Sequence, residues 1–249
     1  MLETNKLHEG DFLELMEKID DKSIDMILCD LPYGTTACKW DVIIPFDLLW
    51  KQYKRIIKQN GAIVLTASQP FTSTLVMSNI KAFKQGLVWD KQKGSNPLLA
   101  SKRIMQSHED ILVFCYGSLP YYPQFRQGKP YKAPSTGGNR TNSIVASKGD
   151  SEGFKQKDNE GIRYPLSVLP FSIHCGSKLH STQKPVELFE YLIKTYTKEG
   201  ELVLDNCAGS GTTGIAALNT NRQFILMEKE KKYVEVIEKR LNQYSESKQ

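Results

Sequence analysis

The tetrapeptide Asp30-Leu31-Pro32-Tyr33 closes the apolar run 24–29 and brings together groups that could bind a nucleobase. The run predicts a buried strand, which Pro32 ends. A carboxylate, a carbonyl released by the turn and an aromatic ring then lie at the carboxyl end of a strand, where open α/β sheets bind ligands. The two oxygens can accept hydrogen bonds from an exocyclic amine, and the ring can stack on the base. On its own, such a tetrapeptide more often marks an ordinary turn.

A second motif lies near the other end of the chain, where an apolar run leads into a glycine-rich turn. Residues 201–205 predict a strand, and Gly209, Gly211 and Gly214 then spell G-x-G-x-x-G at the start of a predicted helix. Glycine permits the tight turn and the close approach of a ligand. The acidic Glu228 ends the next predicted strand. This arrangement is typical of a nucleotide-binding βαβ unit whose acid binds ribose hydroxyls, and NAD is its simplest ligand.

The position of the glycine motif in the chain argues against NAD. After Gly214 there is room for the rest of one helix, one strand and a final helix over 230–244. A dinucleotide domain needs a longer βαβαβ continuation. The missing strands must therefore come from the N-terminal half, which places the nucleotide half of the sheet at the C-terminus and the tetrapeptide half at the N-terminus.

In this order the motifs resemble those of the amino-methylating DNA methyltransferases that use S-adenosylmethionine, in the permuted, beta-type arrangement where the catalytic tetrapeptide precedes the cofactor loop. The tetrapeptide departs from the family's D/N/S-P-P-Y/F/W pattern at Leu31. The family's H-P-T-Q-K-P motif is matched except at Ser181, and its D-x-F-x-G-S/T-G-T loop except at Cys207 and Ala208. The matching segments are Gly10-Asp11, Asp30-Leu31-Pro32-Tyr33, Trp89 to Lys91, His108-Glu109, 180–185 and 205–212.

The resemblance implies a catalytic role for Asp30, Leu31, Pro32 and Tyr33. The Asp30 carboxylate and the Leu31 carbonyl would hold the target amine, and Tyr33 would stack on a base flipped out of double-stranded DNA. An Asp at position 30 resembles adenine-N6 enzymes more than cytosine-N4 enzymes. The expected activity is therefore site-specific methylation of adenine N6 without a metal ion, and cytosine N4 is the alternative.

The resemblance also implies that S-adenosylmethionine is the cofactor. Asp11 would accept the cofactor's adenine amine, Glu228 would bind its ribose, and Lys184 would lie at its methionine end. Simpler roles stay open, because Asp11 could only cap a helix, Glu228 could be a surface acid, and Lys184 could only precede a helix. The predicted cofactor-binding residues are Asp11, Lys184, Asp205, Ala208, Gly209, Ser210, Gly211, Thr212 and Glu228.

The pattern of elements predicts an α/β fold. Helical patterns begin at Pro45, Pro70 and Pro185, a residue type favoured in the first turn of helices. Strands that alternate with helices indicate a doubly wound, mainly parallel, Rossmann-like sheet of the methyltransferase type, with seven strands. The candidate strands are 7–9, 24–29, 62–66, 87–90, 111–116, 202–205 and 224–228.

The segment 117–179 differs from the rest of the chain. It holds eight Gly and six Pro, and its nine Lys or Arg exceed its four Asp or Glu by five, which equals the whole net charge of +5. Basic residues neutralise phosphates and aromatic rings stack on bases. The simpler interpretation is a long solvated loop. Because the family places its target-recognition region here, we predict DNA contacts by Arg126, Lys129, Lys132 and Arg140, with 1–116 and 180–249 forming the catalytic and cofactor-binding domain.

Composition limits the remaining choices. A chain of 249 residues with 40% hydrophobic and 24% charged residues suffices for one core, or a core with a small insert. We expect no membrane span and no secretion signal. Five cysteines without C-x-x-C spacing predict a reducing cytoplasm and neither disulfides nor a zinc site. The family resemblance implies a protein of a prokaryote or a phage. The protein could form a homodimer and accompany a cognate restriction endonuclease. A non-catalytic nucleic-acid-binding module, or a methyltransferase acting on RNA or protein, remains the alternative.

Overall fold

The computed structural model contains two compact units. The larger comprises 1–122 and 166–249, and the smaller comprises 123–165. The boundaries of the smaller unit lie inside the segment 117–179 that the sequence sets apart. The structure describes residues 1–34, 41–95, 97–132, 158–173 and 183–247.

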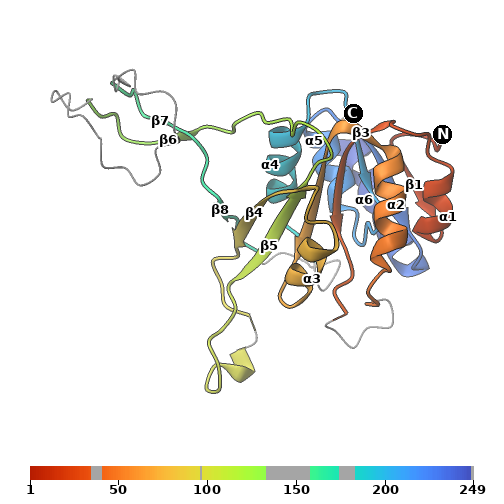
Figure 1. Ribbon diagram of the computed structural model, residues 1–249, viewed down its shortest axis with the longest axis horizontal. Coiled ribbons are helices and arrows are strands. Elements are labelled where there is room, and N and C mark those ends of the chain that lie inside the picture. Colours follow the sequence, from red (N-terminus) through yellow and green to blue (C-terminus); the bar gives the residue numbers. More distant parts are fainter. Residues whose placement is uncertain (35–40, 96, 133–157, 174–182, 248–249) are drawn as a thin grey trace. The chain divides into compact units, whose positions relative to one another are not determined.

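The larger unit is built on an eight-stranded sheet of order β1-β10-β9-β2-β3-β5-β4-β8 (Figure 1). Its strand pairs are parallel, except that β5 is antiparallel to both β3 and β4. The strands are β1 (Lys6–Glu9), β2 (Ile24–Asp30), β3 (Ile57–Ala67), β4 (Phe83–Asp90), β5 (His108–Phe114), β8 (Val168–Pro170), β9 (Leu202–Asp205) and β10 (Gln223–Glu228).

The predicted α/β fold with a mainly parallel sheet is confirmed, and each of the seven predicted strands is present. The expected strand number of seven is corrected to eight. Strand β8 comes from within the segment 117–179 and pairs in parallel with β4, Leu169 lying opposite Trp89. A strand of three residues is too short to show an alternating pattern in the sequence. It forms because the free edge of β4 offers backbone partners, and not because of its own residues.

Helices cover both faces of the sheet, and the alternation of side chains along β2 supplies a core to each face. Ile27 and Cys29 pack in the core with α1, α2 and α3. Met26 and Leu28 pack in the core with α4, α5 and α6. The helices are α1 (Phe12–Glu17), α2 (Phe46–Ile56), α3 (Phe71–Ser78), α4 (Val186–Tyr196), α5 (Thr212–Asn219) and α6 (Lys231–Ser247), with a short 3-10 turn, η1 (Pro97–Leu99).

The sheet reverses its winding between β9 and β2, which are parallel neighbours. From β9 the order runs through β10 to β1, and from β2 it runs through β3 in the opposite direction. The connections on either side of such a reversal diverge and leave a crevice at the carboxyl ends of the strands. Strand β2 ends at this edge with Asp30, and strand β9 ends there with Asp205.

The smaller unit contains a two-stranded antiparallel pair, β6 (Arg126–Gln127) and β7 (Ile162–Arg163). Beyond this pair, Tyr131 and Asn159 bridge the same two segments through reciprocal backbone hydrogen bonds of 2.9 Å. The unit therefore has a short β-ribbon as its described framework.

Candidate active site

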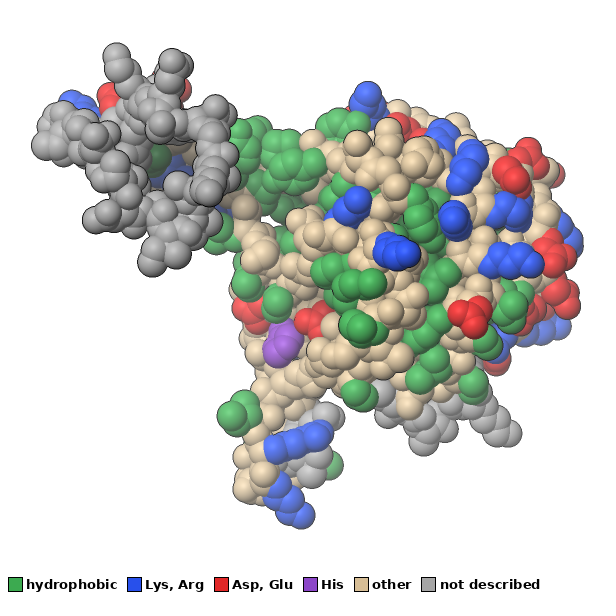
Figure 2. Space-filling view, in the orientation of Figure 1, with side chains coloured by type: hydrophobic (Ala, Val, Ile, Leu, Met, Phe, Trp, Pro, Cys, Tyr) green, Lys and Arg blue, Asp and Glu red, His purple; other side chains and the backbone are tan. Residues whose placement is uncertain are grey.

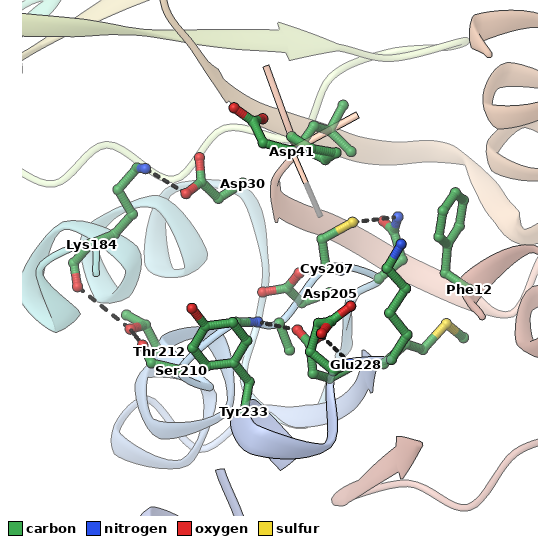
Figure 3. A pocket seen from close by; sticks show the side chains of 18 of the residues that line it. Phe12, Asp30, Asp41, Lys184, Asp205, Cys207, Ser210, Thr212, Glu228 and Tyr233 are labelled. Atoms are coloured by element: carbon green, nitrogen blue, oxygen red, sulfur yellow. Dashed lines mark hydrogen bonds and ion pairs between the residues drawn. The ribbon is translucent and has the colours of Figure 1, made fainter. Parts of the chain in front are cut away.

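A cavity of about 320 Å³ opens at the carboxyl edge of the sheet, where the winding reverses. Its size falls within the ~300–1,000 Å³ typical of small-molecule sites. The N-terminal tetrapeptide lines one part of it, and the glycine-rich loop and Glu228 line another. Figure 3 shows Asp30 and Lys184 facing each other in this cavity, with Glu228 and Tyr233 further along its wall. The two motifs that the sequence separates by 175 positions (Asp30 to Asp205) thus share one cavity.

Asp30 is held by three hydrogen-bond donors. Its Oδ1 accepts from the hydroxyl of Tyr33 at 2.7 Å and from the hydroxyl of Thr66. Its Oδ2 lies 2.5 Å from the ammonium of Lys184. An ionised carboxylate offers about four acceptor positions, so Asp30 keeps room for one further donor, such as an amine.

Lys184 lies between two carboxylates. Its side chain is 6% exposed, and its ammonium also lies 3.3 Å from Glu109 Oε2. Burial lowers the pKa of Lys184, but the negative charges of Asp30 and Glu109 and the hydrogen bond to Asp30 outweigh this, so the pKa is raised and the side chain stays charged. The structure brings the Lys184 ammonium to the tetrapeptide, and its position at the methionine end of a cofactor stays a prediction.

Glu109 lies in this site, although the sequence, which singled out His108-Glu109 only as a matching segment, did not predict it as a site residue. Its Oε1 forms an ion pair with Lys91. Its Oε2 is buried without a hydrogen-bond partner among the described residues, since the contact with Lys184 is an ion pair without hydrogen-bond alignment. Four alternating charges, Lys91, Glu109, Lys184 and Asp30, therefore run from the end of β4 to the tetrapeptide. No local signal reveals this chain of charges, because it joins positions far apart in the sequence.

Tyr33 is fixed by its ring and by its hydroxyl. The ring stacks on Phe71 with centroids 5.2 Å apart and planes 27° apart, and the Lys184 ammonium lies 5.8 Å from the ring centre. Burial, followed by the charges of Asp30 and Glu109, raises the pKa of Tyr33 well above its ordinary value. The hydroxyl therefore stays protonated and donates to Asp30. Stacking of Tyr33 on a target base stays a prediction.

The glycine-rich loop needs glycine at particular positions. Gly209 and Gly211 have φ of 54° and 75°, where side chains are strained. A Cβ on Gly211 would lie 3.0 Å from Ile237, and a Cβ on Gly214 would lie 2.8 Å from Leu226. Arg240 of α6 donates to the backbone carbonyl of Ser210. The loop is thus packed tightly from behind while its front lines the cavity.

Asp205 stabilises this loop by hydrogen bonds to residues on either side of its glycines. It accepts hydrogen bonds from the Cys207 amide at 3.0 Å and from the Thr213 hydroxyl at 2.5 Å. Burial raises the pKa of Asp205 to about 6 in spite of these bonds. Thr212, one of the predicted cofactor residues, is also buried, and its hydroxyl lies 3.5 Å from the Lys184 carbonyl.

Glu228 is oriented by the backbone. Its Oε2 accepts from the Gly209 amide at 2.8 Å, and its Oε1 accepts from the Glu230 amide at 2.9 Å. Burial raises the pKa of Glu228. One acceptor position on each oxygen remains, which is the pair that two neighbouring ribose hydroxyls need.

The structure places Asp11 differently from the other predicted residues. Its carboxylate caps α1 by accepting from the Leu13 amide at 2.9 Å, and the residue is exposed. Its neighbours Gly10 and Phe12 line the cavity, but Asp11 does not. The helix cap is therefore the role that the geometry supports, and cofactor binding by Asp11 stays a prediction.

Further residues line the cavity without any local motif that marks them. Asp41 is buried and accepts from the Gly34 amide at 2.8 Å. The apolar parts of the wall come from Phe12, Ile44 and Tyr233. Phe12 directly follows the Gly10-Asp11 segment that the sequence singled out, which is the one signal that could have found it.

The predicted DNA-binding residues belong to the smaller unit. Arg126 is exposed and donates to the Tyr164 carbonyl at 3.2 Å, and Lys129 and Lys132 are exposed. The same unit holds two ring contacts: Arg163 lies over the Tyr131 ring at 4.6 Å, and Phe125 and Tyr164 meet edge to face with centroids 5.1 Å apart. Arg140 and the segment 180–182 lie outside the described residues.

Two searches of the described residues gave negative results. No group of three or more His, Cys, Asp or Glu side chains there could hold a metal ion. No helix there is both long and apolar enough to cross a membrane.

Comparison with known proteins gives consistent matches. Residues 24–239 match the model of the N6_N4_Mtase family, described as DNA methylase. The Type II methyltransferase M.HinfI of Haemophilus influenzae is 27% identical over 96% of this chain and 68% of the relative. The Type II methyltransferase M1.MboII of Moraxella bovis is 25% identical over 98% of both chains.

Solved structures share the fold. A crystal structure of an M1.HpyAVI–SAM complex has a TM-score of 0.65 at 23% identity, covering 95% of this chain and 98% of that one. The cytosine-N4-specific PvuII DNA methyltransferase has a TM-score of 0.67 at 17% identity, covering 95% and 86%. At these identities the likeness concerns the fold.

Proposed function

This chain belongs to the N6_N4_Mtase family of DNA methylases, which transfer a methyl group from S-adenosylmethionine, and on that premise we propose that it methylates adenine N6 at a specific site in double-stranded DNA. The observation that carries the proposal is the position of Asp30 in the same cavity as the glycine-rich loop. A base amine at Asp30 would then lie beside a cofactor held by the loop.

The residues of the cavity fit S-adenosylmethionine. Gly209 and Gly211 present backbone without side chains, and Glu228 has acceptor positions left for a ribose diol. Phe12 and Tyr233 provide apolar wall for the remainder. When bound, the cofactor supplies a methyl group on a positively charged sulfur.

Asp30 and Leu31 would orient the target amine. The lone pair of adenine N6 is delocalised into the ring, which makes the nitrogen a weak nucleophile. Hydrogen bonds from the amine to the Asp30 carboxylate and the Leu31 carbonyl favour a more tetrahedral nitrogen whose lone pair points at the methyl group, and such alignment lowers the barrier. The nitrogen gains positive charge as it reacts, so the Asp30 carboxylate stabilises the transition state more than the ground state.

The target base must leave the duplex to reach Asp30. The Asp30 side chain is 24% exposed and lies in a cavity, so a stacked and paired base cannot approach it. In this proposal Tyr33 offers the ring face that does not contact Phe71 to the extruded base. The ring also fixes Asp30 through its hydroxyl, which links capture of the base to the position of the carboxylate.

The segment 117–179 would recognise the DNA site. Three of its described basic residues, Arg126, Lys129 and Lys132, are exposed in a unit that also holds aromatic rings, and phosphate contacts by such residues fix a protein's register on DNA. Arg140 belongs to the same proposed surface. The proposal further places the enzyme in the cytoplasm, as a monomer or a homodimer, beside a cognate restriction endonuclease where one exists.

The test is direct analysis of methylated nucleosides. Purified protein, S-adenosylmethionine and unmethylated genomic DNA are incubated, and the DNA is digested and analysed by mass spectrometry. We expect N6-methyladenine, with activity lower by at least about 100-fold for Asp30→Ala because a transition-state contact is lost. Asp21→Ala, which removes an exposed carboxylate before β2, is the control and should keep activity. Methylation-sensitive sequencing then gives the site.

Each other outcome has a distinct meaning. N4-methylcytosine would move the assignment to cytosine N4. Methylation of RNA, but not of DNA, would change the substrate class. Calorimetric binding of S-adenosylmethionine without any methyl transfer would indicate a non-catalytic module.

A further inference from the structure

The loop that joins β4 to β5 leaves the sheet at the same edge as the cavity. Asp30 lies opposite Thr66, Thr66 opposite Ile111, and Ile111 opposite Leu87. Three strand spacings of ~4.8 Å therefore separate Asp30 from Leu87 by about 14 Å, or about four base-pair steps of 3.4 Å. The β4–β5 loop, here the described residues 91–95 and 97–107, begins just beyond Leu87, and Figure 1 shows it extending past the ends of both strands.

The base of this loop is ordered and tied to the cavity. The Lys91 amide donates to the Ser107 carbonyl at 2.8 Å, and the Ser95 amide to the Gln106 carbonyl at 2.9 Å. The Gln106 side chain donates to the Ser68 hydroxyl at 3.1 Å, and Ser68 lines the cavity. The loop is therefore held at the rim of the active site.

The end of the loop exposes large apolar side chains. Leu98 is 93% exposed and Ile104 is 95% exposed, the highest values for large hydrophobic residues in the described part of the chain. Side chains this exposed contribute almost nothing to the core of the protein. Apolar groups that are held away from a core and beside a cavity are suited to burial in a partner.

The charge of the loop identifies the kind of partner. The sequence 91–107 contains Lys91, Lys93, Lys102 and Arg103 and no acidic residue. Lys91 pairs with Glu109, which leaves Lys93, Lys102 and Arg103 as exposed cations. Figure 2 shows basic and apolar side chains next to each other on this projection. Basic side chains next to apolar ones are the combination found in proteins that insert apolar side chains between neighbouring base pairs and unstack them.

We propose that the β4–β5 loop is a second DNA-binding element, which binds the duplex beside the target base. Lys93, Lys102 and Arg103 contact phosphates, and Leu98 and Ile104 enter the base stack and help to extrude the target. This inference rests on the proposed DNA methylation but concerns residues that the recognition segment 117–179 does not contain. It also gives the exposed apolar side chains a partner surface to bury against.

The first test compares matched and mismatched duplexes that carry the methylation site. A mismatched target base is easier to extrude. We expect Leu98→Ala/Ile104→Ala to lower kcat/KM by about tenfold on the matched duplex and to come within about threefold of wild type on the mismatched one. Met77→Ala/Ile80→Ala, exposed by 71% and 54% at the far end of α3, should match wild type on both. An unchanged matched rate, or an equal loss on both duplexes, would overturn the wedge.

The second test measures binding and does not depend on methyl transfer. Fluorescence anisotropy with a labelled duplex gives the dependence of affinity on salt. Replacing Lys93, Lys102 and Arg103 by Gln should weaken binding and reduce the slope of log K against log salt by roughly 2–3, because each phosphate contact contributes about 0.9. Lys81→Gln/Lys84→Gln, which removes two exposed cations at the amino end of β4, is the control and should leave the slope unchanged. An unchanged slope would refute the phosphate contacts even if methylation is normal. A reduced slope in a protein that methylates no DNA would support them and overturn only the proposed reaction.

Discussion

Lys184 shares its charge between Asp30 and Glu109, and this sharing bears on how the target amine binds. In the structure its ammonium lies 2.5 Å from Asp30 and 3.3 Å from Glu109 Oε2. An amine that donates to the remaining acceptor position of Asp30 shares the negative charge of this carboxylate with Lys184. Glu109 Oε2, which has no hydrogen bond from the described residues, gives the ammonium a second partner as the amine arrives.

Glu109→Gln should therefore slow methyl transfer by about tenfold or more. A neutral amide holds an ammonium less well than a carboxylate does, so Lys184 stays on Asp30 and opposes the amine. We expect kcat to fall while calorimetric binding of S-adenosylmethionine by the folded protein stays close to wild type. Lys91→Met is the matched control, since it removes the other partner of Glu109 and should cost less. Wild-type kcat in Glu109→Gln would contradict this role.

Asp205 makes stability depend on pH in a predictable direction. Burial raises its pKa from the ordinary 3.8 to about 6. Between these values the folded protein holds a proton that the unfolded chain has released, so the free energy of unfolding falls as pH rises through this window. This difference in pKa between the unfolded and folded protein corresponds to about 3 kcal/mol of stability, which is lost by about pH 7.

Asp205→Asn tests this dependence because an amide does not titrate. Urea unfolding at about pH 4 and about pH 7.5 should show wild type losing up to about 3 kcal/mol relative to Asp205→Asn as pH increases. The Asn side chain can still hydrogen-bond the Cys207 amide and the Thr213 hydroxyl, which limits other effects. A difference between the two proteins that is the same at both pH values would contradict the shifted pKa.

At the scale of elements, the turn into α5 depends on glycine, and the chain offers a matched pair of positions to test it. Gly211 has φ of 75° with Ile237 3.0 Å from a Cβ, whereas Gly200 has φ of 80° with nothing within 4 Å. Alanine at either position should cost about 1–2 kcal/mol of stability through backbone strain. Only Gly211→Ala should also weaken calorimetric binding of S-adenosylmethionine, by at least about tenfold, because the displaced loop lines the cavity. Equal affinities in the two variants would exclude this role.

The sequence correctly predicted those strands, turns and helices whose conformation depends mainly on their own residues. The apolar run before Asp30 and the glycines after Asp205 gave strands, a turn and a helix at the right places, since strand alternation and glycine conformations are local properties. Strand β8 was missed because three residues acquire a partner only when the edge of β4 forms. Glu109 was missed as a site residue for a similar reason: its contacts with Lys91 and Lys184 exist only in the folded sheet.

At the scale of the whole molecule, the division into two units predicts separable tasks. Removing 123–165 and joining Tyr122 to Leu166 through a short flexible linker deletes the smaller unit and keeps the eight-stranded sheet. We expect this protein to bind S-adenosylmethionine within a few-fold of wild type and to lose site selection. DNA binding should weaken but persist through the β4–β5 loop.

The full-length triple variant Arg126→Gln/Lys129→Gln/Lys132→Gln is the control for this deletion. It should weaken DNA binding and leave the fold unchanged, so loss of affinity can be separated from loss of the unit. Sequencing of methylated genomic DNA measures site selection in both proteins. Site-specific methylation by the deletion protein at the wild-type level would refute a recognition role for the smaller unit.

The pairing of the first strand with the last has a consequence for how the protein is made. Lys6 of β1 lies opposite Ile225 of β10, and in the described sheet β10 is the only partner of β1. A ribosome adding about 5–20 residues per second needs roughly 10–40 s to synthesise the chain between these two residues. Until then the newly made β1, and the side of β2 that later meets β9, remain without their partners. The sheet can therefore close only after β10 has been synthesised, and the strand edges made earlier stay unpaired during that interval.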